Sequence, residues 1–546
     1  MSIVLDGLEI RLESLSGTKL VRDYYSGDPE LGTFYSGYPW SLSAFRRRAE
    51  LVKRRATGER QRLLRESVEP TSPRAAEKLE RIAAGEGFVV TTGQQAGLFG
   101  GPLYTAYKVL TTVKLAQVLE ETLGVPVAPL FWSPADDHDW EEVNHMGVLD
   151  ARNQLQRVEL PGQPDSAVSM ARRRVGEGIA NTLQHLTELL PANEFAGRQL
   201  ELLQTAYAPH AFFADAFKTV IAHTFARFDL LMVASSHKAL KRFSIPLITR
   251  ELEHTERHAA LLRSQTDRLL AAGYHEQVAI ADDAANVMYE DEHGRERLVQ
   301  ENGGWVLRRT KRQFRHEELL ALLQSEPERF SPNVLLRPVV ESNAFPTLAY
   351  VGGPAELSYF AQTGCLFVAH EVPMPLFFPR KSGDLVEAKV QKVLDKFGLT
   401  PLDLRRPFHE LASQIARDEL PHDVTSALQQ LRRDITDGYG SLVNAATGID
   451  QTLRGPLEGA RNSSHKHLED AERKILQHLK KQNEIGLEQV RKASTNLFPN
   501  GERQERVLGT INYLARYGES LLTGIMDALD LQIDAVVEGW DGVRCA

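Results

Sequence analysis

The sequence is poor in cysteine. Only Cys365 and Cys545 occur among its 546 residues, and they stand far apart in the chain. They provide neither a disulfide framework nor a C-x-x-C redox or zinc motif. We therefore expect a protein of a reducing compartment, the cytoplasm, and we interpret Cys365 as a small buried apolar residue.

Long apolar runs and an excess of basic charge are also missing. The longest apolar stretches, such as LFVA and PLFF, are far shorter than the roughly 20 residues of a membrane-spanning helix. The N-terminal residues show no basic segment followed by an apolar one, so we expect no signal peptide. A net charge of −9, with both signs spread along the chain, argues against a dedicated nucleic-acid binder. We expect neither a membrane nor a nucleic-acid partner.

What is present is the composition of a large soluble protein, with 42% apolar and 25% charged residues. Its length suffices for several domains with a substantial core. The patterns of helix and strand signals predict five regions. These are a helical lead-in (1–85), the first half of a Rossmann-like core (86–150), connecting insertions with a core strand near 229–235 (151–340), the second half of the core (341–395), and a helical coiled-coil and C-terminal region (396–546).

Two strand–turn–helix segments predict an α/β fold with a parallel sheet. The run GFVVTTGQQ predicts a strand, a helix extends from Pro102 to Gly124, and VPVAPLFW predicts the next strand. Such a crossover implies parallel strands. Further along, FPTLAYVGGPAELSYFAQTG predicts a strand, a turn and a helix, and CLFVAHEVPMPLFFPRKSG predicts further strand. DLLMVASS, near Ser235, predicts another core strand.

The C-terminal region has the spacing of long amphipathic helices. Apolar residues recur every three, four or seven positions, at Val424, Leu428, Leu431, Ile435 and Leu442. A second charged helix is expected after the RGPLEG break, over 463–493. Two such helices joined by a turn predict an antiparallel coiled coil. The alternative is that both helices pack onto the globular body.

The first candidate site is the stretch VVTTGQQAGLFGGPLYTAYK, residues 89–108. Glycine costs backbone entropy, so a cluster between a strand and a helix indicates a tight turn or a close approach to a ligand. Helix N-termini bind anions through their free N–H groups. The spacing fits neither G-x-G-x-x-G nor G-x-x-x-x-G-K-[ST], and a merely tight turn is the alternative. The residues expected to hold an anion are Gly93, Gly97, Gly100 and Gly101, aided by Thr91, Thr92, Gln94, Gln95, Tyr104 and Lys108.

A second junction repeats this device. AYVGGPAELSYF places Gly352, Gly353 and Pro354 between a strand and a helix, with Glu356 in the first helical turn. In open α/β sheets, ligands bind beyond the carboxyl ends of the strands. We therefore expect both glycine junctions to lie at the same site.

The third candidate is FWSPADDHDWEEVNH, residues 131–145, which ends in Asn144 and His145. Asp136, Asp137, His138 and Asp139 could bind a substrate ammonium, organise Mg²⁺, or act as acid or base. The alternative is a solvated helix cap, since aspartates favour the start of a helix. No second pair of His or Cys accompanies this group, so we expect no zinc.

Two further motifs carry weaker signals. Arg380, Lys381 and Ser382 form a small basic loop at a strand end, suited to phosphate, although a basic surface turn is equally compatible. His254 and His258 stand at i and i+4 but lack the Glu of the zincin motif. Because they lie in a run dense with charge, we predict a solvated helix face and no bound metal.

Together TTGQQAGLFGGPLYTAYK, FWSPADDHDWEEVNH, FPTLAYVGGPAELSYF and FFPRKS, followed by a helical C-terminus, resemble the cysteine-adding enzymes of bacillithiol synthesis, the BshC family. The resemblance implies a Rossmann-like core like that of class I aminoacyl-tRNA synthetases, with connecting-peptide insertions. It also implies a coiled-coil domain that anchors a homodimer. The implied activity joins L-cysteine to glucosaminyl malate through an amide bond.

On this hypothesis the cysteine carboxylate is activated, with ATP and Mg²⁺ as the expected cosubstrates and no tightly bound cofactor. The synthetase histidine motif has no counterpart in GGPLY, so adenylation remains a hypothesis. Asp137, His138, Asp139 and Lys108 are the expected catalytic residues. Those expected to bind substrate or nucleotide are Thr92, Gly93, Gln94, Gln95, Gly97, Gly100, Gly101, Tyr104, Asn144, Gly352, Gly353, Glu356, Arg380 and Ser382. The alternatives are a non-catalytic nucleotide- or sugar-binding scaffold, or a nucleotidyltransferase acting on another small acid.

Overall fold

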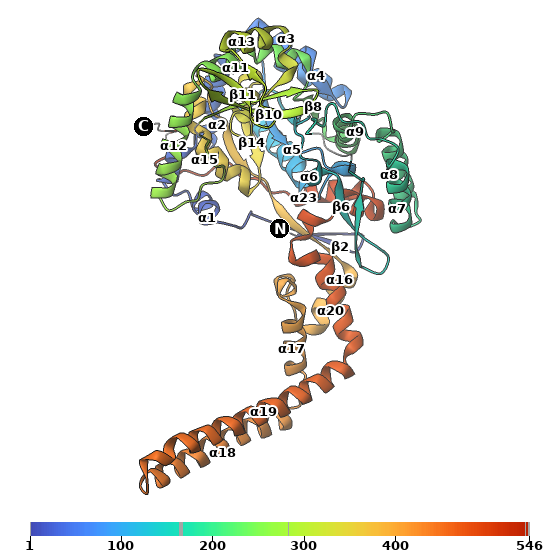
Figure 1. Cartoon of the computed structure of the whole chain (residues 1–546). Helices are drawn as coiled ribbons and strands as arrows, with labels where there is room; N and C mark the ends of the chain where they lie inside the picture. The colour runs from blue at the N-terminus through green and yellow to red at the C-terminus, as the bar shows by residue number, and fades with distance from the viewer. Residues whose placement is uncertain (1, 163–166, 282, 541, 544–546) are drawn as a thin grey trace. The chain divides into compact units, whose positions relative to one another are not determined.

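The computed structural model describes residues 2–543 except 163–166, 282 and 541 (Figure 1). Cys545 lies outside the described residues. The chain divides into two compact units, Met1–Leu385 with Glu505–Ala546, and Val386–Gln504. The helical region expected over 396–546 is thus shared between the two units.

A six-stranded sheet forms the centre of the larger unit. Its strand order is β15 (Leu376–Pro379), β14 (Thr347–Gly352), β4 (Phe88–Gly93), β5 (Val127–Ser133), β8 (Leu231–Ala234) and β3 (Glu69–Pro70). The first five strands are parallel, and β3 runs antiparallel to β8. Every residue of β4 and β5 is buried, as expected for central parallel strands covered on both faces. This confirms the predicted Rossmann-like core.

Two helices connect neighbouring strands of this sheet. Helix α5 (Tyr104–Leu123) links β4 to β5 and ends at Gly124, whose φ of 68° closes the helix. Helix α15 (Pro354–Ala369) links β14 to β15, and Figure 1 shows both helices beside the strands. The apolar residues at helical spacing at the start of α5 are fully buried: Leu103, Ala106, Leu110 and Val113. The prediction of strand for CLFVA was wrong, because these residues belong to α15. That helix is buried nearly all round, and such an apolar run has no period that separates helix from strand.

The lead-in also contains a hairpin that was not predicted. Strands β1 (Ser2–Leu5) and β2 (Leu8–Glu13) pair antiparallel. Asp6 and Gly7 connect them with φ of 46° and 79°, which is the Asp-Gly turn typical of two-residue hairpins. The predicted helices follow as α1 (Lys19–Ser26), α2 (Leu42–Lys53), α3 (Gly58–Ser67) and α4 (Pro73–Ala83).

The insertions supply a second sheet and a set of helices. Five strands form an antiparallel sheet in the order β12 (Gln313–Phe314), β11 (Gly304–Leu307), β10 (Gly294–Glu301), β9 (Ala284–Asp291) and β13 (Phe330–Pro332). The hairpin β6 (His145–Leu149) and β7 (Leu155–Glu159) follows the short helix α6 (Trp140–Val143). The helices are α7 (Ile179–Leu189), α8 (Glu194–Ala206), α9 (Phe213–Phe225), α10 (Lys238–Phe243), α11 (Ile245–Glu253), α12 (Thr255–Ala271), α13 (His316–Ser325) and α14 (Arg337–Ala344). After the smaller unit, α21 (Gln504–Val507), α22 (Thr510–Tyr517) and α23 (Ser520–Ala528) complete the larger one.

The smaller unit is helical. Strand β16 (Ser382–Glu387) leads into it, and its helices are α16 (Ala388–Phe397), α17 (Phe408–Asp418), α18 (His422–Thr447), α19 (Arg454–Gln482) and α20 (Glu484–Leu497). Helices α18 and α19 lie side by side (Figure 1) and are antiparallel, since Arg432 pairs with Glu472 and Tyr439 with Ser464. The expected break at RGPLEG was wrong, because α19 begins there, at Arg454. The chain reverses instead between Gly448 and Leu453.

None of the helices that the structure describes combines the length and the apolar character that a membrane span requires.

Candidate functional site

A cavity of about 710 Å³ lies at the carboxyl ends of the parallel strands. The end of β4 contributes Gly93, Gln94 and Gln95, and the end of β5 contributes Asp136 and Asp137. Gly353, Pro354, Ala355 and Glu356 enter from the junction of β14 and α15. Both glycine junctions thus reach one hollow, but the first does so through Gly93, Gln94 and Gln95 and not through Gly97, Gly100 or Gly101. The volume of the cavity is that of a pocket for a small metabolite or nucleotide.

A largely buried ion pair joins helix α5 to the first turn of helix α15. Lys108 Nζ lies 2.6 Å from Glu356 Oε2, and it also donates to the Gly93 carbonyl (2.9 Å) and to Gln94 Oε1 (3.0 Å). All three ammonium hydrogens are thereby engaged. Lys108 thus holds the Gln94 loop in place and has no spare donor for a substrate.

The Glu356 carboxylate occupies the helix N-terminus that was expected to bind a foreign anion. Its Oε2 accepts from the Gly353 N–H (2.7 Å) and its Oε1 from the Tyr350 hydroxyl (2.6 Å). Burial alone would raise the pKa of Glu356, but Lys108, the Gly353 N–H and Tyr350 bring this pKa below its ordinary value. Burial lowers the pKa of Lys108, and Glu356 opposes that shift. The chain itself thus supplies the anion at this junction.

Arg337, at the start of α14, was not predicted as a site residue. Its Nη1 donates to Glu341 Oε2 (2.8 Å) and its Nη2 to the Tyr359 hydroxyl (2.7 Å). Arg337, Tyr350 and Tyr359 all line the cavity. A guanidinium held in this way is fixed in orientation, and planar guanidinium groups suit carboxylates and phosphates.

Arg380 lines the cavity, but its guanidinium is paired with Glu505. The two side chains form a bidentate pair at 2.9 and 3.1 Å, and both are buried. The guanidinium carbon lies 5.4 Å from the centre of the Tyr104 ring. Burial raises the pKa of Tyr104 to about 12, so its hydroxyl stays protonated at neutral pH. Tyr104 Oη accepts from Gln94 Nε2 (3.0 Å) and can donate to a ligand.

The predicted group of Asp136, Asp137, His138 and Asp139 does not share one environment. Asp136 forms a buried pair with Lys241 at 2.8 Å. Asp137 lines the cavity, and its Oδ2 accepts from Gln95 Nε2 at 2.8 Å. Asp139 accepts from the N–H of Glu142 and caps α6, as the alternative interpretation proposed. Of the three aspartates, only Asp137 lines the cavity without a lysine or arginine at ion-pair distance among the described residues.

His138 lies beside the cavity wall and does not line it directly. Its Nδ1 is 3.4 Å from Arg295 Nη1 and 3.8 Å from Asp137 Oδ1. Burial and the Arg295 charge lower the pKa of His138, against the opposing effect of Asp137 and Asp139. The imidazole is therefore neutral at pH 7 and able to accept a proton.

Several predicted binding residues lie away from the cavity lining. Gly97, Gly100 and Gly101 form a buried turn: φ is 94° at Gly100 and 74° at Gly101, and a Cβ on Gly97 would lie 2.8 Å from the Gly101 Cα. These three positions are glycine because the turn is tight, which is the alternative that the sequence left open. The other four are buried. Thr92 donates to the Val351 carbonyl, and Asn144 donates to the Glu159 carboxylate. A Cβ on Gly352 would contact Phe377, and Ser382 lies in strand β16.

The sequence did not predict the contributions of the insertion and of the C-terminal segment. Arg295 and Arg297 come from β10 and Arg506 from α21. Basic lining residues are Lys108, Arg295, Arg297, Arg337, Arg380 and Arg506, and acidic ones are Asp136, Asp137, Glu142 and Glu356. Among the described residues Arg295, Arg297 and Arg506 form no ion pair with a carboxylate. The cavity can therefore accept both an anionic and a cationic group of a ligand.

The prediction of a solvated face for His258 was wrong. His258 is buried, and its Nδ1 lies 2.6 Å from Glu251 Oε2. His370 Nε2 lies 2.9 Å from the same oxygen, so one carboxylate holds two rings. Burial would raise the pKa of Glu251, but the two histidines bring it to about 2. Cys365, in α15, is buried as predicted.

Comparison with known proteins gives two family matches that together span most of the chain. Residues 6–381 match the family described as bacillithiol biosynthesis BshC, N-terminal Rossmann-like domain, and residues 384–532 match its C-terminal coiled-coil domain. A protein of Salinibacter ruber is 33% identical over 93% of this chain and 93% of its own length. Relatives from Koribacter versatilis and Bacillus cytotoxicus are 29% and 27% identical, over 94% of this chain and 95% and 96% of their own. All three relatives carry the provisional name cysteine ligase BshC. The chain belongs to the BshC family of bacillithiol biosynthesis.

Proposed function

We propose that the protein is a cytoplasmic ligase that joins L-cysteine to glucosaminyl malate through an amide bond. The observation that carries this proposal is the single cavity shared by the loops after β4, β5 and β14. The relatives' name, cysteine ligase BshC, supports the same reaction. A carbon–nitrogen ligation needs an activated carboxylate, a bound amine and a group that accepts the amine proton.

The charges of the cavity fit these two substrates. Glucosaminyl malate carries two carboxylates and an amine, and cysteine carries one carboxylate and an ammonium. Arg295, Arg297 and Arg506 supply positive charge for the carboxylates. Asp137 and Glu142 supply negative charge that suits an ammonium group.

Proton transfer falls to Asp137 and His138. An ammonium must lose a proton before its nitrogen attacks a carbonyl. Asp137 lies in the cavity wall and would bind the ammonium and accept its proton. His138, whose Nδ1 lies 3.8 Å from Asp137 Oδ1, would receive the proton from that carboxylate. Lys108 acts as a positioning residue in this scheme, because Glu356, Gly93 and Gln94 occupy its three hydrogens.

Activation of the cysteine carboxylate by ATP with Mg²⁺ is part of the proposal. The cavity has room for a nucleotide. Trp132 and Arg380 line it, and each has a buried N–H group, Nε1 and Nε, without a protein partner among the described residues. These donors suit phosphate or carboxylate oxygens. Asp137 and Glu142 are lining carboxylates that would hold Mg²⁺, which would supply positive charge to the phosphates of the nucleotide.

The experiment is a ligation assay with purified protein, L-cysteine, glucosaminyl malate and ATP–Mg²⁺, with bacillithiol measured by mass spectrometry. Omission of ATP, or its replacement by GTP, tests the activating nucleotide. Product formation that requires every component would support the proposal. No product under any nucleotide and metal condition would contradict it.

We also propose that the chain is a homodimer held by its coiled coil. Among the described residues of α18 only Val443 is buried, while Leu431 and Leu442 are 48% and 50% exposed. Apolar residues on one face of a long helix are typical of a partner helix. Light scattering after size-exclusion chromatography should give twice the chain mass for the native protein and the monomer mass for Leu431→Gln/Leu442→Gln. A monomeric native protein would contradict the proposal.

A further inference from the structure

A second pocket lies at the amino ends of the parallel strands of the central sheet. Its wall includes Phe88, which begins β4, and Phe345 and Pro346, which directly precede β14. The first cavity lies at the other ends of the same strands, so the two pockets are separate. Helix α14 extends between them, with Arg337 at the first and Ser342 at the second.

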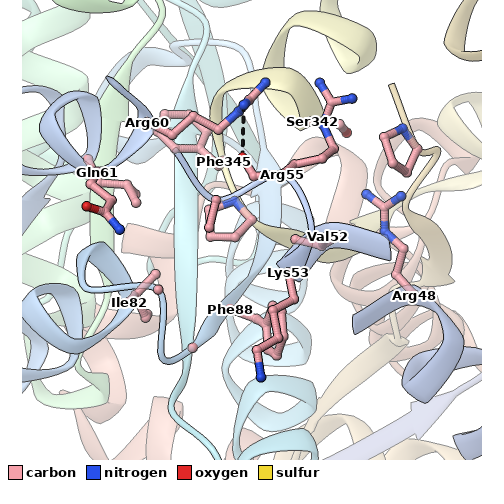
Figure 2. A pocket seen from close by; sticks show the side chains of 16 residues that line it. Arg48, Val52, Lys53, Arg55, Arg60, Gln61, Ile82, Phe88, Ser342 and Phe345 are labelled. Atoms are coloured by element: carbon pink, nitrogen blue, oxygen red, sulfur yellow. Dashed lines mark hydrogen bonds between the residues drawn. The ribbon is translucent and has the colours of Figure 1, made fainter. Parts of the chain in front are cut away.

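The polar part of this pocket is basic. Figure 2 shows Arg48, Arg55 and Arg60 around it, together with Lys53 and the rings of Phe88 and Phe345. Arg48 comes from α2, Arg55 from the turn after it, and Arg60 from α3. No aspartate or glutamate occurs among the described residues that line the pocket.

Arg48 is buried, with an exposed fraction of 4%, and one of its donors is unused. Its Nε donates to the Thr347 carbonyl at 3.0 Å. Its Nη1 is buried and has no hydrogen-bond partner among the described residues. A buried donor without a partner is rare in folded proteins, and it indicates a missing acceptor.

The guanidinium groups of Arg55 and Arg60 add further positive charge, and their hydrogen-bond partners do not neutralise it. Arg55 Nη2 and Arg60 Nη2 share Asn343 Oδ1, at 2.8 and 3.0 Å, and Arg60 Nη1 donates to the Arg55 carbonyl at 2.9 Å. These acceptors are all neutral. The nearby carboxylate of Glu371 is 81% exposed and pairs with Arg250 at 3.5 Å. Burial and the Arg55 charge lower the pKa of Arg48 to about 9.

We infer that this pocket binds a small oxyanion, a phosphate or a carboxylate group, with Arg48 Nη1 as its central donor. Such an anion would satisfy the unused donor and offset the repulsion among three arginines. The free space of about 40 Å³ has room for roughly three water molecules. This space suits one oxyanion and excludes a bulky ligand. The apolar wall of Val52, Ile82, Phe88 and Phe345 would exclude water from the bound group.

The inference is independent of the proposed ligase activity and has its own test. Isothermal titration of the full-length protein with phosphate, and separately with acetate, is carried out at ionic strength held constant with chloride. Arg48→Met removes the central donor. Arg47→Met is the matched control, because Arg47 is the exposed neighbour on the same helix. Arg55→Gln is a second test variant that retains Arg48, for use if Arg48→Met fails to fold.

We expect one saturable site for at least one of the two anions, with affinity reduced at least tenfold by Arg48→Met or Arg55→Gln and less than twofold by Arg47→Met. The preferred anion tells a phosphate from a carboxylate. Crystals grown with selenate and measured at the selenium edge locate the site, with a peak expected beside the Arg48 guanidinium. Absence of saturable binding, equal losses in Arg47→Met and Arg48→Met, or a selenium peak only in the larger cavity would overturn the inference.

Discussion

The ion pair between Lys108 and Glu356 gives a prediction that separates stability from catalysis. Both side chains lie in the site, and Lys108 is 4% exposed. Lys108→Met leaves the Glu356 carboxylate buried, with the Gly353 N–H and the Tyr350 hydroxyl as its remaining donors. Glu356→Gln leaves the ammonium buried with two neutral acceptors. Breaking a buried pair from one side costs about 3–5 kcal/mol.

The double variant Lys108→Met/Glu356→Gln removes both charges, so no buried charge is left unpaired. Its destabilisation should be close to that of one single variant, so the coupling energy should be about as large as a single loss, about 3–5 kcal/mol. Because a protein with two compact units seldom unfolds in one step, the measurement is hydrogen exchange of peptides from α5 and α15, which reports local opening free energies.

Ligation activity should follow a different order. The double variant regains stability, but it still lacks the ammonium that holds Gln94 and the Gly93 carbonyl, so its activity should remain low. Additive opening free energies, with a coupling below about 0.5 kcal/mol, would refute the interpretation of a buried charge pair. Full activity in the double variant would refute the positioning role of Lys108.

Three further predictions concern single side chains. Asp137→Asn should reduce kcat/KM for ligation at least tenfold. The matched variant Asp139→Asn should change kcat/KM less than threefold, because asparagine caps a helix as well as aspartate does. Equal losses in the two variants would contradict the role of Asp137. Arg295→Met should raise the pKa of His138 and Asp137→Asn should lower it, since the first charge depresses this pKa and the second raises it. Histidine NMR, with the His138 signal identified from His138→Gln, measures both shifts, and a change of opposite sign would count against this geometry. The Glu251 pKa of about 2 lies below its ordinary 4.5, so the stabilisation is present above pH 4.5 and is lost as the pH falls toward 2. Glu251→Gln should lower the local opening free energy of α11 by about 3 kcal/mol at pH 7 and abolish this acid dependence. Unchanged hydrogen-exchange protection of α11 peptides at pH 7 would contradict the prediction.

The sequence predicted the parts of the fold that have a clear local pattern. The βαβ unit from Phe88 to Ser133 followed from apolar runs and from Pro102 and Gly124 at the helix ends. The edge of the sheet that holds the cavity followed from the rule that parallel strands end together. The hairpin at Asp6 and Gly7 had a local signal that the prediction did not use.

The parts of the site that were missed depend on long-range packing. Arg295 and Arg506 lie far from the strand ends in sequence, and neither belongs to a motif. Arg337 did carry a usable signal, as a charged residue between LL and PVV in an apolar stretch. The glycine loop was misleading for another reason: a φ of 94° at Gly100 requires glycine for the turn itself, whether or not a ligand lies nearby.

The central claim is that the loops after β4, β5 and β14 form one substrate site. A crystal structure with glucosaminyl malate and cysteine tests it most directly. Both molecules should lie in the cavity bounded by Gln94, Asp137 and Arg337, with the amine of glucosaminyl malate toward Asp137 and its malate carboxylates toward the arginines. Binding of either substrate at another surface, with this cavity empty of both, would show that these loops do not form the substrate site.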